Sequence, residues 1–230
     1  MTNYVAMIPA RMGSKRIPKK NVRFMCGKPL IYYPIELCKK SGLFKDIYLN
    51  TESDALGKVG MDMGIKFHKR PDELSGDNAT NREFTYEFLK NHECDYVIMV
   101  NPTSPLLSQK TLFGFVKFVG ENNYDTVLSV VDIREESLFR EKPLNYSLDE
   151  KKNSQDLEPV QTIVWALTAW KRETFLSNQD EGINPVFGGK IGVFSIPKDE
   201  SCDLDTEEDW RIAEGILISR QTIHEARYLI

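Results

Sequence analysis

The first 35 residues of the chain contain no aspartate or glutamate, although the 230-residue sequence has a net charge of −4. The same stretch holds seven basic residues: Arg11, Lys15, Arg16, Lys19, Lys20, Arg23 and Lys28. An excess of positive charge confined to one segment of an acidic protein favours a small anionic ligand. A nucleic-acid-binding surface needs a broadly basic face, and the pI near 5.6 argues against one.

The sequence also lacks the cysteine and histidine patterns of zinc sites and the long apolar runs of membrane-spanning segments. The four cysteines form no CxxC pair and only three histidines are present, so we expect no zinc site. Scattered thiols are typical of the reducing cytoplasm, where we expect the protein to reside. The sequence has no apolar run near the ~20 residues of a membrane span, and its start lacks the apolar core of a signal peptide.

The hydrophobic pattern alternates between short apolar runs and helical spacing, which predicts an α/β fold. Strands are predicted at 4–9, 46–51, 65–68, 95–100, 126–131, 164–170 and 190–196. Helices are predicted at 29–41 (imperfect or kinked at Pro34), 53–63, 81–91, from Ser108 onward, and 206–220. This order implies a mostly parallel sheet with helices on both faces. The polar stretch 133–156 is either an excursion from the core or a flexible arm.

Ligands of such sheets bind at the carboxyl ends of the strands, so the loops that leave those ends should converge. The first, PARMGSKRIPKKN, offers backbone N–H groups around Gly13 and Ser14, and Arg11 and Lys20 can neutralise a triphosphate. It is neither a GxxxxGK[ST] loop nor GxGxxG. The alternative is a solvated basic loop.

Two carboxylates, Asp203 and Asp205, precede the last helix and share one face of an extended segment. Paired carboxylates suit Mg²⁺, and helix capping is the alternative. The loop NPTSPLL places Asn101 where its amide can meet a ligand, or it is only a rigid connection. Arg70 and Asp77 lie in a charged loop that either recognises a base or phosphate or forms a surface turn.

Together these segments resemble the CMP-sialic acid synthetase (acylneuraminate cytidylyltransferase) family. The similar pieces are IPARMGSKRIPKKN at 8–21, GKPL at 27–30, RPDELSGDNAT at 70–80, NPTSPLL at 101–107 and DLDTEEDW at 203–210. The resemblance implies a Rossmann-like nucleotidyltransferase domain over residues 1–230. It also implies a projecting dimerisation and sugar-binding excursion at 133–170, and a homodimer.

The resemblance further implies transfer of CMP from CTP to the anomeric hydroxyl of a nonulosonic acid, with Mg²⁺. In that case Arg11, Gly13, Ser14, Lys20 and Asn21 hold CTP. Arg70 and Asp77 lie near the base and ribose, Asn101 faces the sugar, and Asp203 and Asp205 bind the metal. Arg11, Lys20, Asp203 and Asp205 are then the catalytic residues.

The acceptor half departs from the family pattern. Asn101 and Leu107 stand where the family usually has glutamine and arginine, and no arginine occurs between Arg140 and Arg172. Two alternatives therefore stay open: a cytidylyltransferase with another acidic or phosphonate acceptor, and a non-catalytic nucleotide-binding paralogue.

Overall fold

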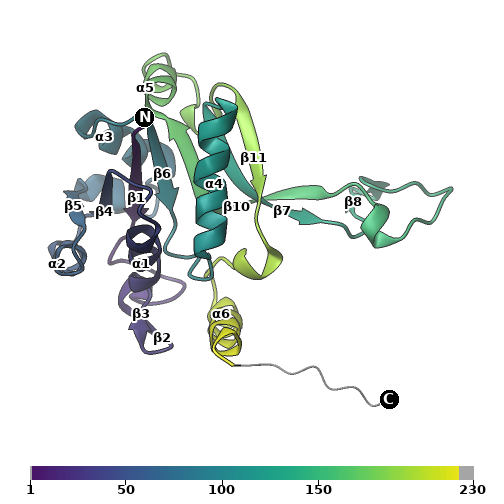
Figure 1. Cartoon of the computed structure of the whole chain (residues 1–230), viewed down its shortest axis with the longest axis horizontal. Coiled ribbons are helices and arrows are strands. Elements are labelled where there is room, and N and C mark those ends of the chain that lie inside the picture. Colours follow the sequence, from purple (N-terminus) through teal and green to yellow (C-terminus); the bar gives the residue numbers. More distant parts are fainter. Residues whose placement is uncertain (1, 223–230) are drawn as a thin grey trace.

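The computed structural model describes residues 2–222. Within them, seven strands form a sheet in the order β11-β7-β10-β6-β1-β4-β5 (Figure 1). Their bounds are β1 Tyr4–Pro9, β4 Asp46–Thr51, β5 Lys66–Lys69, β6 Tyr96–Val100, β7 Thr126–Ile133, β10 Val160–Lys171 and β11 Ile191–Ser195. All pairs are parallel except those of β10, which runs antiparallel to β6 and β7. The predicted mostly parallel α/β sheet is confirmed.

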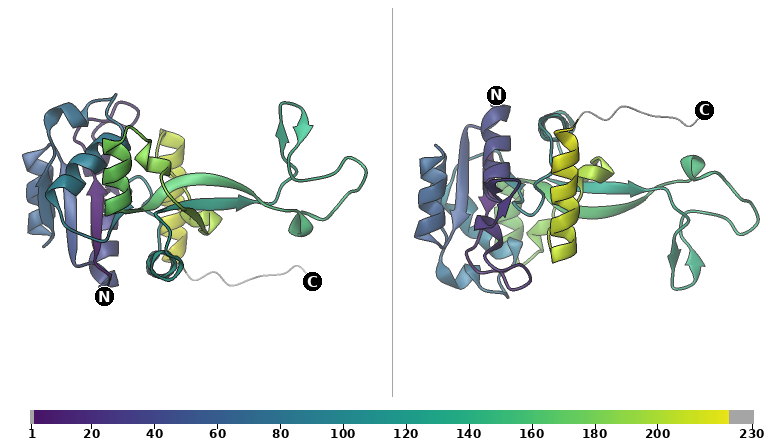
Figure 2. Two further views of the ribbon diagram at one scale, coloured as in Figure 1. Left: turned by 90° about the horizontal axis from the view of Figure 1, so that it is seen from above. Right: turned by 90° about the horizontal axis from the view of Figure 1, so that it is seen from below.

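Helices cover both faces of this sheet (Figure 2). Helices α1 (Tyr32–Ser41), α2 (Asp54–Asp62) and α4 (Gln109–Asn122) pack on one face, and α3 (Asn81–Asn91) and α5 (Arg172–Asp180) on the other. Side-chain caps begin four of the helices, as at Ser53, Thr80 and Ser108, and at Thr206 before α6 (Glu207–Arg220). Among residues 2–222, no helix combines the length and the apolar character needed to span a bilayer.

The helices differ from the prediction at two places. Helix α1 begins at Tyr32, so Pro34 lies in its first turn, where a missing N–H costs no intrahelical bond and no kink is needed. Helix α5 was not predicted, because its two apolar residues, Phe175 and Leu176, are adjacent and give no helical period.

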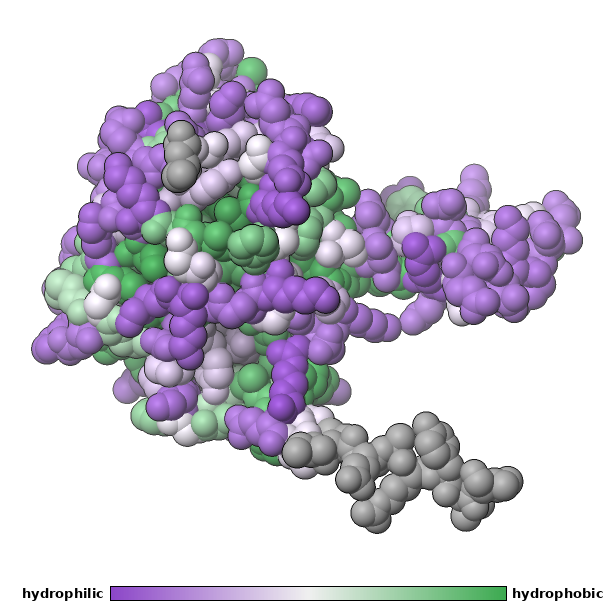
Figure 3. Space-filling model, viewed as in Figure 1, coloured by the Kyte–Doolittle hydropathy of each residue, from purple (hydrophilic) through white to green (hydrophobic). Residues whose placement is uncertain are grey.

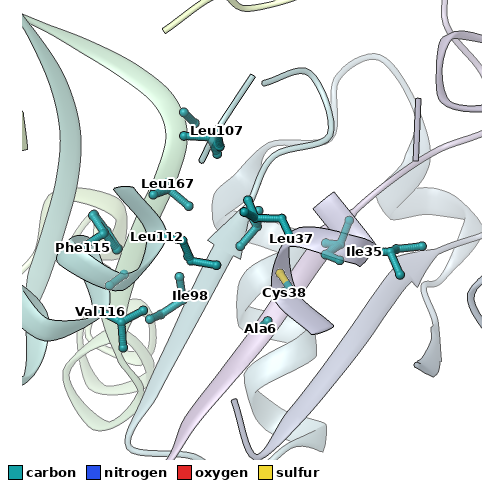
Figure 4. Close-up of a cluster of buried hydrophobic side chains, with 14 of the residues drawn as sticks. Ala6, Ile35, Leu37, Cys38, Ile98, Leu107, Leu112, Phe115, Val116 and Leu167 are labelled. Atoms are coloured by element: carbon teal, nitrogen blue, oxygen red, sulfur yellow. The ribbon is translucent and has the colours of Figure 1, made fainter. Parts of the chain in front are cut away.

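The strands alternate their side chains between two apolar clusters. In β1, Ala6 and Ile8 enter the cluster under α1 and α4, whereas Val5 and Met7 enter the cluster under α3 and α5. Figure 4 shows the first cluster, where Cys38 of α1 and Leu112 of α4 face the sheet. Both faces of the central strands are therefore dry, and polar ligands are confined to the strand ends.

A third, smaller cluster lies beneath the basic loop and joins it to α6. It includes Ile17, Met25, Leu204 and Trp210, all at most 2% exposed. The hairpin of β2 (Phe24–Met25) and β3 (Lys28–Pro29) belongs to it. This cluster brings the loop after β1 and the acidic segment before α6 to the same place.

An arm formed by residues 134–159 extends away from the sheet between β7 and β10 (Figures 1 and 2). It carries the short hairpin β8 (Leu138–Phe139) and β9 (Lys142–Pro143). The chain returns as β10, whose residues 166–170 are buried in the sheet. Residues 1 and 223–230, including His224, lie outside the described part of the predicted domain.

The histidines predict a pH dependence of stability. His92 Nε2 lies 2.9 Å from His68 Nδ1, and His68 Nε2 lies 2.7 Å from Glu87. Burial, and then the neighbouring His68, lowers the pKa of His92 from 6.5 to about 4. Because the unfolded chain takes up a proton at this site below pH 6.5 and the folded chain does not, His92 lowers stability as the pH falls from 6.5 toward 4.

We therefore expect the free energy of unfolding of the His92→Phe variant to fall less than that of the wild type between pH 6.5 and pH 4. Denaturant titrations at closely spaced pH values measure it. Parallel curves for the two proteins from pH 7 down to 4 would contradict the assignment, and the interval above pH 7 serves as the control.

Candidate functional site

A cavity of about 590 Å³ opens at the carboxyl ends of β1, β5 and β6. This volume is typical of small-molecule sites. The residues that the sequence singled out as candidates and that line it are Arg11, Gly13, Ser14, Lys20, Asn21, Arg70, Asp77, Asn101 and Asp203. Asp205 does not line the cavity. The loop after β4 also stays outside, but Glu52 Oε1 accepts a hydrogen bond from Met12 N at 2.8 Å and supports the basic loop.

The basic loop is fixed to the protein body. The buried Asn21 donates from Nδ2 to Arg11 O at 2.8 Å, and its own carbonyl accepts from Ile31 N at 3.0 Å. Ile17 is fully buried beneath the loop. These contacts hold the backbone in one shape while its cationic side chains remain at the cavity wall, which is the arrangement that anion binding requires.

Several of these cations already contact carboxylates. Arg11 Nη1 lies 3.0 Å from Asp77 Oδ1, and Lys15 pairs with the other oxygen of Asp77. Hydrogen bonds from Lys15 and Arg11 lower the pKa of Asp77. Arg16 lies 2.7 Å from Asp205. The carboxylate of Asp77 thus occupies a position at which an anionic ligand would meet two cations.

Lys20 and Asp203 face each other across the loop and the acidic segment. Lys20 Nζ donates to Leu204 O at 2.6 Å. Burial lowers the pKa of Lys20, while Asp203 and Asp205 oppose that shift. Asp203 is exposed to the cavity, but the surrounding wall crowds its carboxylate. This desolvation raises its pKa, and the charge of Asp205 adds to the rise.

Helix capping, the alternative role of the two carboxylates, is carried out by other residues. The cap belongs to Thr206 and Asp209: Asp209 Oδ2 accepts from Asp205 N at 3.1 Å and from Thr206 N at 2.7 Å. The Asp203 and Asp205 carboxylates therefore have no capping role. Within residues 2–222, no group of three or more His, Cys, Asp or Glu residues could hold a metal ion. Two carboxylates fit Mg²⁺ when phosphate oxygens and water complete its shell.

Arg70 is 3% exposed and forms no salt bridge within the described residues. Its Nε and Nη2 donate to Asn50 Oδ1 and O at 2.7 and 2.8 Å, and its guanidinium lies 4.4 Å above the Phe84 ring. Burial lowers the pKa of Arg70 to about 10. A buried guanidinium that no carboxylate of the described residues contacts directly, at a cavity wall, is suited to a planar polar ligand group.

Sequence reasoning missed the apolar part of the wall, which is formed by Phe84, Met99 and Trp165. Phe84 reads as an ordinary core position of α3. Trp165 lies where β10 loses its regular pairing with β7, so alternation along the strand could not assign its face.

Comparison with known proteins points to one family. The family model described as cytidylyltransferase matches residues 5–206. The chain is 31% identical over 215 residues to N-acylneuraminate cytidylyltransferase A of Danio rerio, covering 91% of this chain and 49% of that protein. It is also 31% identical over 229 residues to pseudaminic acid cytidylyltransferase of Campylobacter jejuni, covering 91% and 94%. The chain thus spans about half the length of the zebrafish protein.

The fold has counterparts among solved structures. CMP:2-keto-3-deoxy-manno-octonic acid synthetase complexed with CTP superposes with a TM-score of 0.69 at 16% identity, over 96% of this chain and 100% of that one. A 4-diphosphocytidyl-2C-methyl-D-erythritol synthase from Anaerococcus prevotii gives 0.64 at 12% identity, over 94% and 99%. At such low identity these likenesses establish the fold alone.

The space around Gly13 yields a prediction. A Cβ added there would meet no atom within 4 Å, so Gly13→Ala should change the unfolding free energy by less than about 0.5 kcal/mol. If phosphates approach this backbone, the same methyl group should weaken binding of a magnesium–triphosphate at least tenfold, as measured by calorimetry. Gly57→Ala is the control, because its Cβ would lie 2.6 Å from the Phe67 ring and should lower stability. An unchanged affinity of Gly13→Ala for the magnesium–triphosphate would show that the phosphates do not approach the backbone of this loop.

Proposed function

The chain belongs to the cytidylyltransferase family, and on that premise we propose that it transfers CMP from CTP to the anomeric hydroxyl of a nonulosonic (sialic-type) acid. The observation that carries the proposal is the meeting of Arg11 and Lys20 with Asp203 at one cavity, although they come from opposite ends of the chain. Cations for a triphosphate and a carboxylate for its metal are both needed for nucleotidyl transfer, and neither suffices alone.

In the proposed reaction the acceptor oxygen attacks the α-phosphorus in line with the leaving group. A new oxygen–phosphorus bond forms, the bond to the β-phosphate bridging oxygen breaks, and pyrophosphate and the hydroxyl proton are released. Arg11 and Lys20 neutralise the β- and γ-phosphates, and the fixed backbone around Gly13 and Ser14 orients them. Lys20 has a lowered pKa because of burial, and a bound triphosphate favours its charged form.

Asp203 and Asp205 are proposed to hold Mg²⁺, which when bound supplies positive charge at the phosphates and a template for their orientation. Arg16 now pairs with Asp205, so nucleotide binding exchanges this contact for others. Arg70 and Asn21 contact the base and ribose, and Asp77 releases Arg11 and Lys15 as the phosphates enter. The four cysteines are free thiols, in keeping with our proposal that the enzyme acts in the cytoplasm.

One observation favours a second candidate for the acceptor. The cationic residues of the cavity wall come from residues 11–20 and from Arg70, and the lining contributed by β6 and β10 (Met99 and Trp165) is uncharged. An acceptor acid whose carboxylate needs an arginine from these strands finds none there. The alternative is therefore a different acidic or phosphonate acceptor, whose anionic group would have to use a cation of the basic loop or Arg70.

Pyrophosphate release in the presence of CTP and Mg²⁺ tests the proposal against a panel of N-acylneuraminic, legionaminic and pseudaminic acids and a phosphonate. We expect Asp203→Asn to reduce turnover at least 100-fold, because it weakens the metal site. Glu208→Gln, in the same acidic run but in the first turn of α6, should keep wild-type turnover. If only the phosphonate supports pyrophosphate release, the acceptor is a phosphonate and not a nonulosonic acid. A wild type that binds CTP but turns over no acceptor would identify a non-catalytic paralogue.

We further propose that the arm joins two copies of the chain into a homodimer. Its large apolar side chains are exposed: Leu138, Phe139, Leu144 and Leu148 are 55–80% accessible. Most of the arm surface visible in Figure 3 is hydrophilic, so these side chains are isolated candidates for contact with a second arm.

The double substitution Leu138→Glu and Phe139→Glu should convert the dimer to a monomer, because it places charge in the proposed interface. Light scattering coupled to gel filtration measures the mass, and Phe113→Glu on α4, also exposed, is the control. A monomeric wild type would refute the proposal.

A further inference from the structure

Strand β10 has an irregularity at the cavity. Its pairing with β7 is regular up to Ile163, opposite Val130, and regular again from Thr168, opposite Leu128. Residues 164–167 therefore stand opposite the single residue Ser129. Such a bulge bends a strand and redirects its side chains, and bulges are frequent beside active sites.

Ser129 closes this bulge. Its side chain is fully buried, and its hydroxyl accepts a hydrogen bond from Leu167 N at 3.0 Å while donating to Val164 O. On the opposite side, Asn101 N donates to Ala166 O at 3.0 Å. Three of the four bulged residues are thus fixed through their backbones, and Trp165 between them is the one whose side chain lines the cavity.

Trp165 differs from the other two tryptophans. Trp170 and Trp210 are at most 2% exposed, and Trp170 Nε1 donates to Val186 O at 3.1 Å. Trp165 is only partly buried, with its ring 5.9 Å from that of Phe187. Its indole N–H forms no hydrogen bond with residues 2–222 and is absent from their buried unpartnered atoms. It is therefore an accessible donor.

In-line attack places the acceptor on the side of the α-phosphorus opposite the pyrophosphate. Because the cations of the basic loop attract the pyrophosphate, the acceptor is left with the uncharged wall of β6 and β10. An indole ring packs well on the C–H face of a sugar, and its N–H can bond an acceptor oxygen. Asn101, whose backbone bonds the same bulge, stands beside it.

We propose that Trp165 is the specificity-determining contact for the acceptor and that Ser129 is the positioning residue that aims it into the cavity. The inference rests on the proposed function and narrows its acceptor to one with an apolar ring face and a neighbouring hydrogen-bond acceptor. A strongly hydrated acid held by charge alone does not fit this wall.

Kinetics of pyrophosphate release test it, using the acid that the wild type turns over best. Trp165→Ala should raise the KM of the acceptor about tenfold and leave the KM of CTP within twofold. Ser129→Ala should do the same, and Ser129→Cys, of similar volume but weaker hydrogen bonding, should fall between. Trp170→Phe is the structural control and should lower stability without separating the two KM values.

Acrylamide quenching of fluorescence gives a readout independent of turnover, since Trp165 is the accessible tryptophan of the three. The acceptor with CMP should protect it, CMP alone should not, and Ser129→Ala should alter quenching in the absence of ligand. An unchanged acceptor KM in Trp165→Ala overturns the inference and leaves the proposed function standing. CTP binding by a wild type that turns over no acid overturns the acceptor class and this inference with it.

Discussion

The cavity depends on the contact between the basic loop and the acidic segment, whose residues Lys20 and Leu204 lie 184 positions apart. Each segment alone concentrates charges of one sign, which repel one another. Brought together, Lys20 bonds the Leu204 carbonyl and Arg16 pairs with Asp205. The burial of Ile17 and Leu204 in one apolar cluster fixes the distance between them. The buried cluster beneath the two segments therefore keeps their opposite charges at a fixed separation, so that a cavity remains between them.

Features that depend on a short stretch of sequence, such as strands and helix caps, could be predicted. All seven strands of the sheet overlap strands predicted from the hydrophobic pattern, and Ser53, Thr80, Ser108 and Thr206 precede their helices as caps. Most candidate site residues also line one cavity, because the carboxyl ends of parallel strands share an edge. Non-local features could not be predicted. The partners of Asp77, the separation of Asp205 from the cavity and the bulge that aims Trp165 all depend on contacts between distant segments.

The cations of the basic loop are partly paired with carboxylates of the protein itself. The carboxylate of Asp77 is shared by Arg11 and Lys15, and Asp205 pairs with Arg16, so an anion that bound here would exchange places with these carboxylates. Because these pairs are substantially exposed, each contributes little to stability and is readily replaced. Arg70 is different: it is buried, it is held by two hydrogen bonds to Asn50, and it lies over the Phe84 ring. The wall thus combines exposed cations of the basic loop, whose ion pairs are readily exchanged, with one cation that is fixed in place.

The bulge also bears on how such an enzyme can diversify. Residues 164–167 are flanked by regular pairing on both sides, so a change of length or side chain there leaves the register of β7 and β10 intact. The basic loop follows β1 and the loop that carries Arg70 follows β5, so neither needs to change with the bulge. Residues 164–167 and the loops after the other strands are separate stretches of the chain. Substitutions in the bulge can therefore change which molecule the cavity accepts without altering those loops, so that one reaction type can be kept while its substrate changes during evolution.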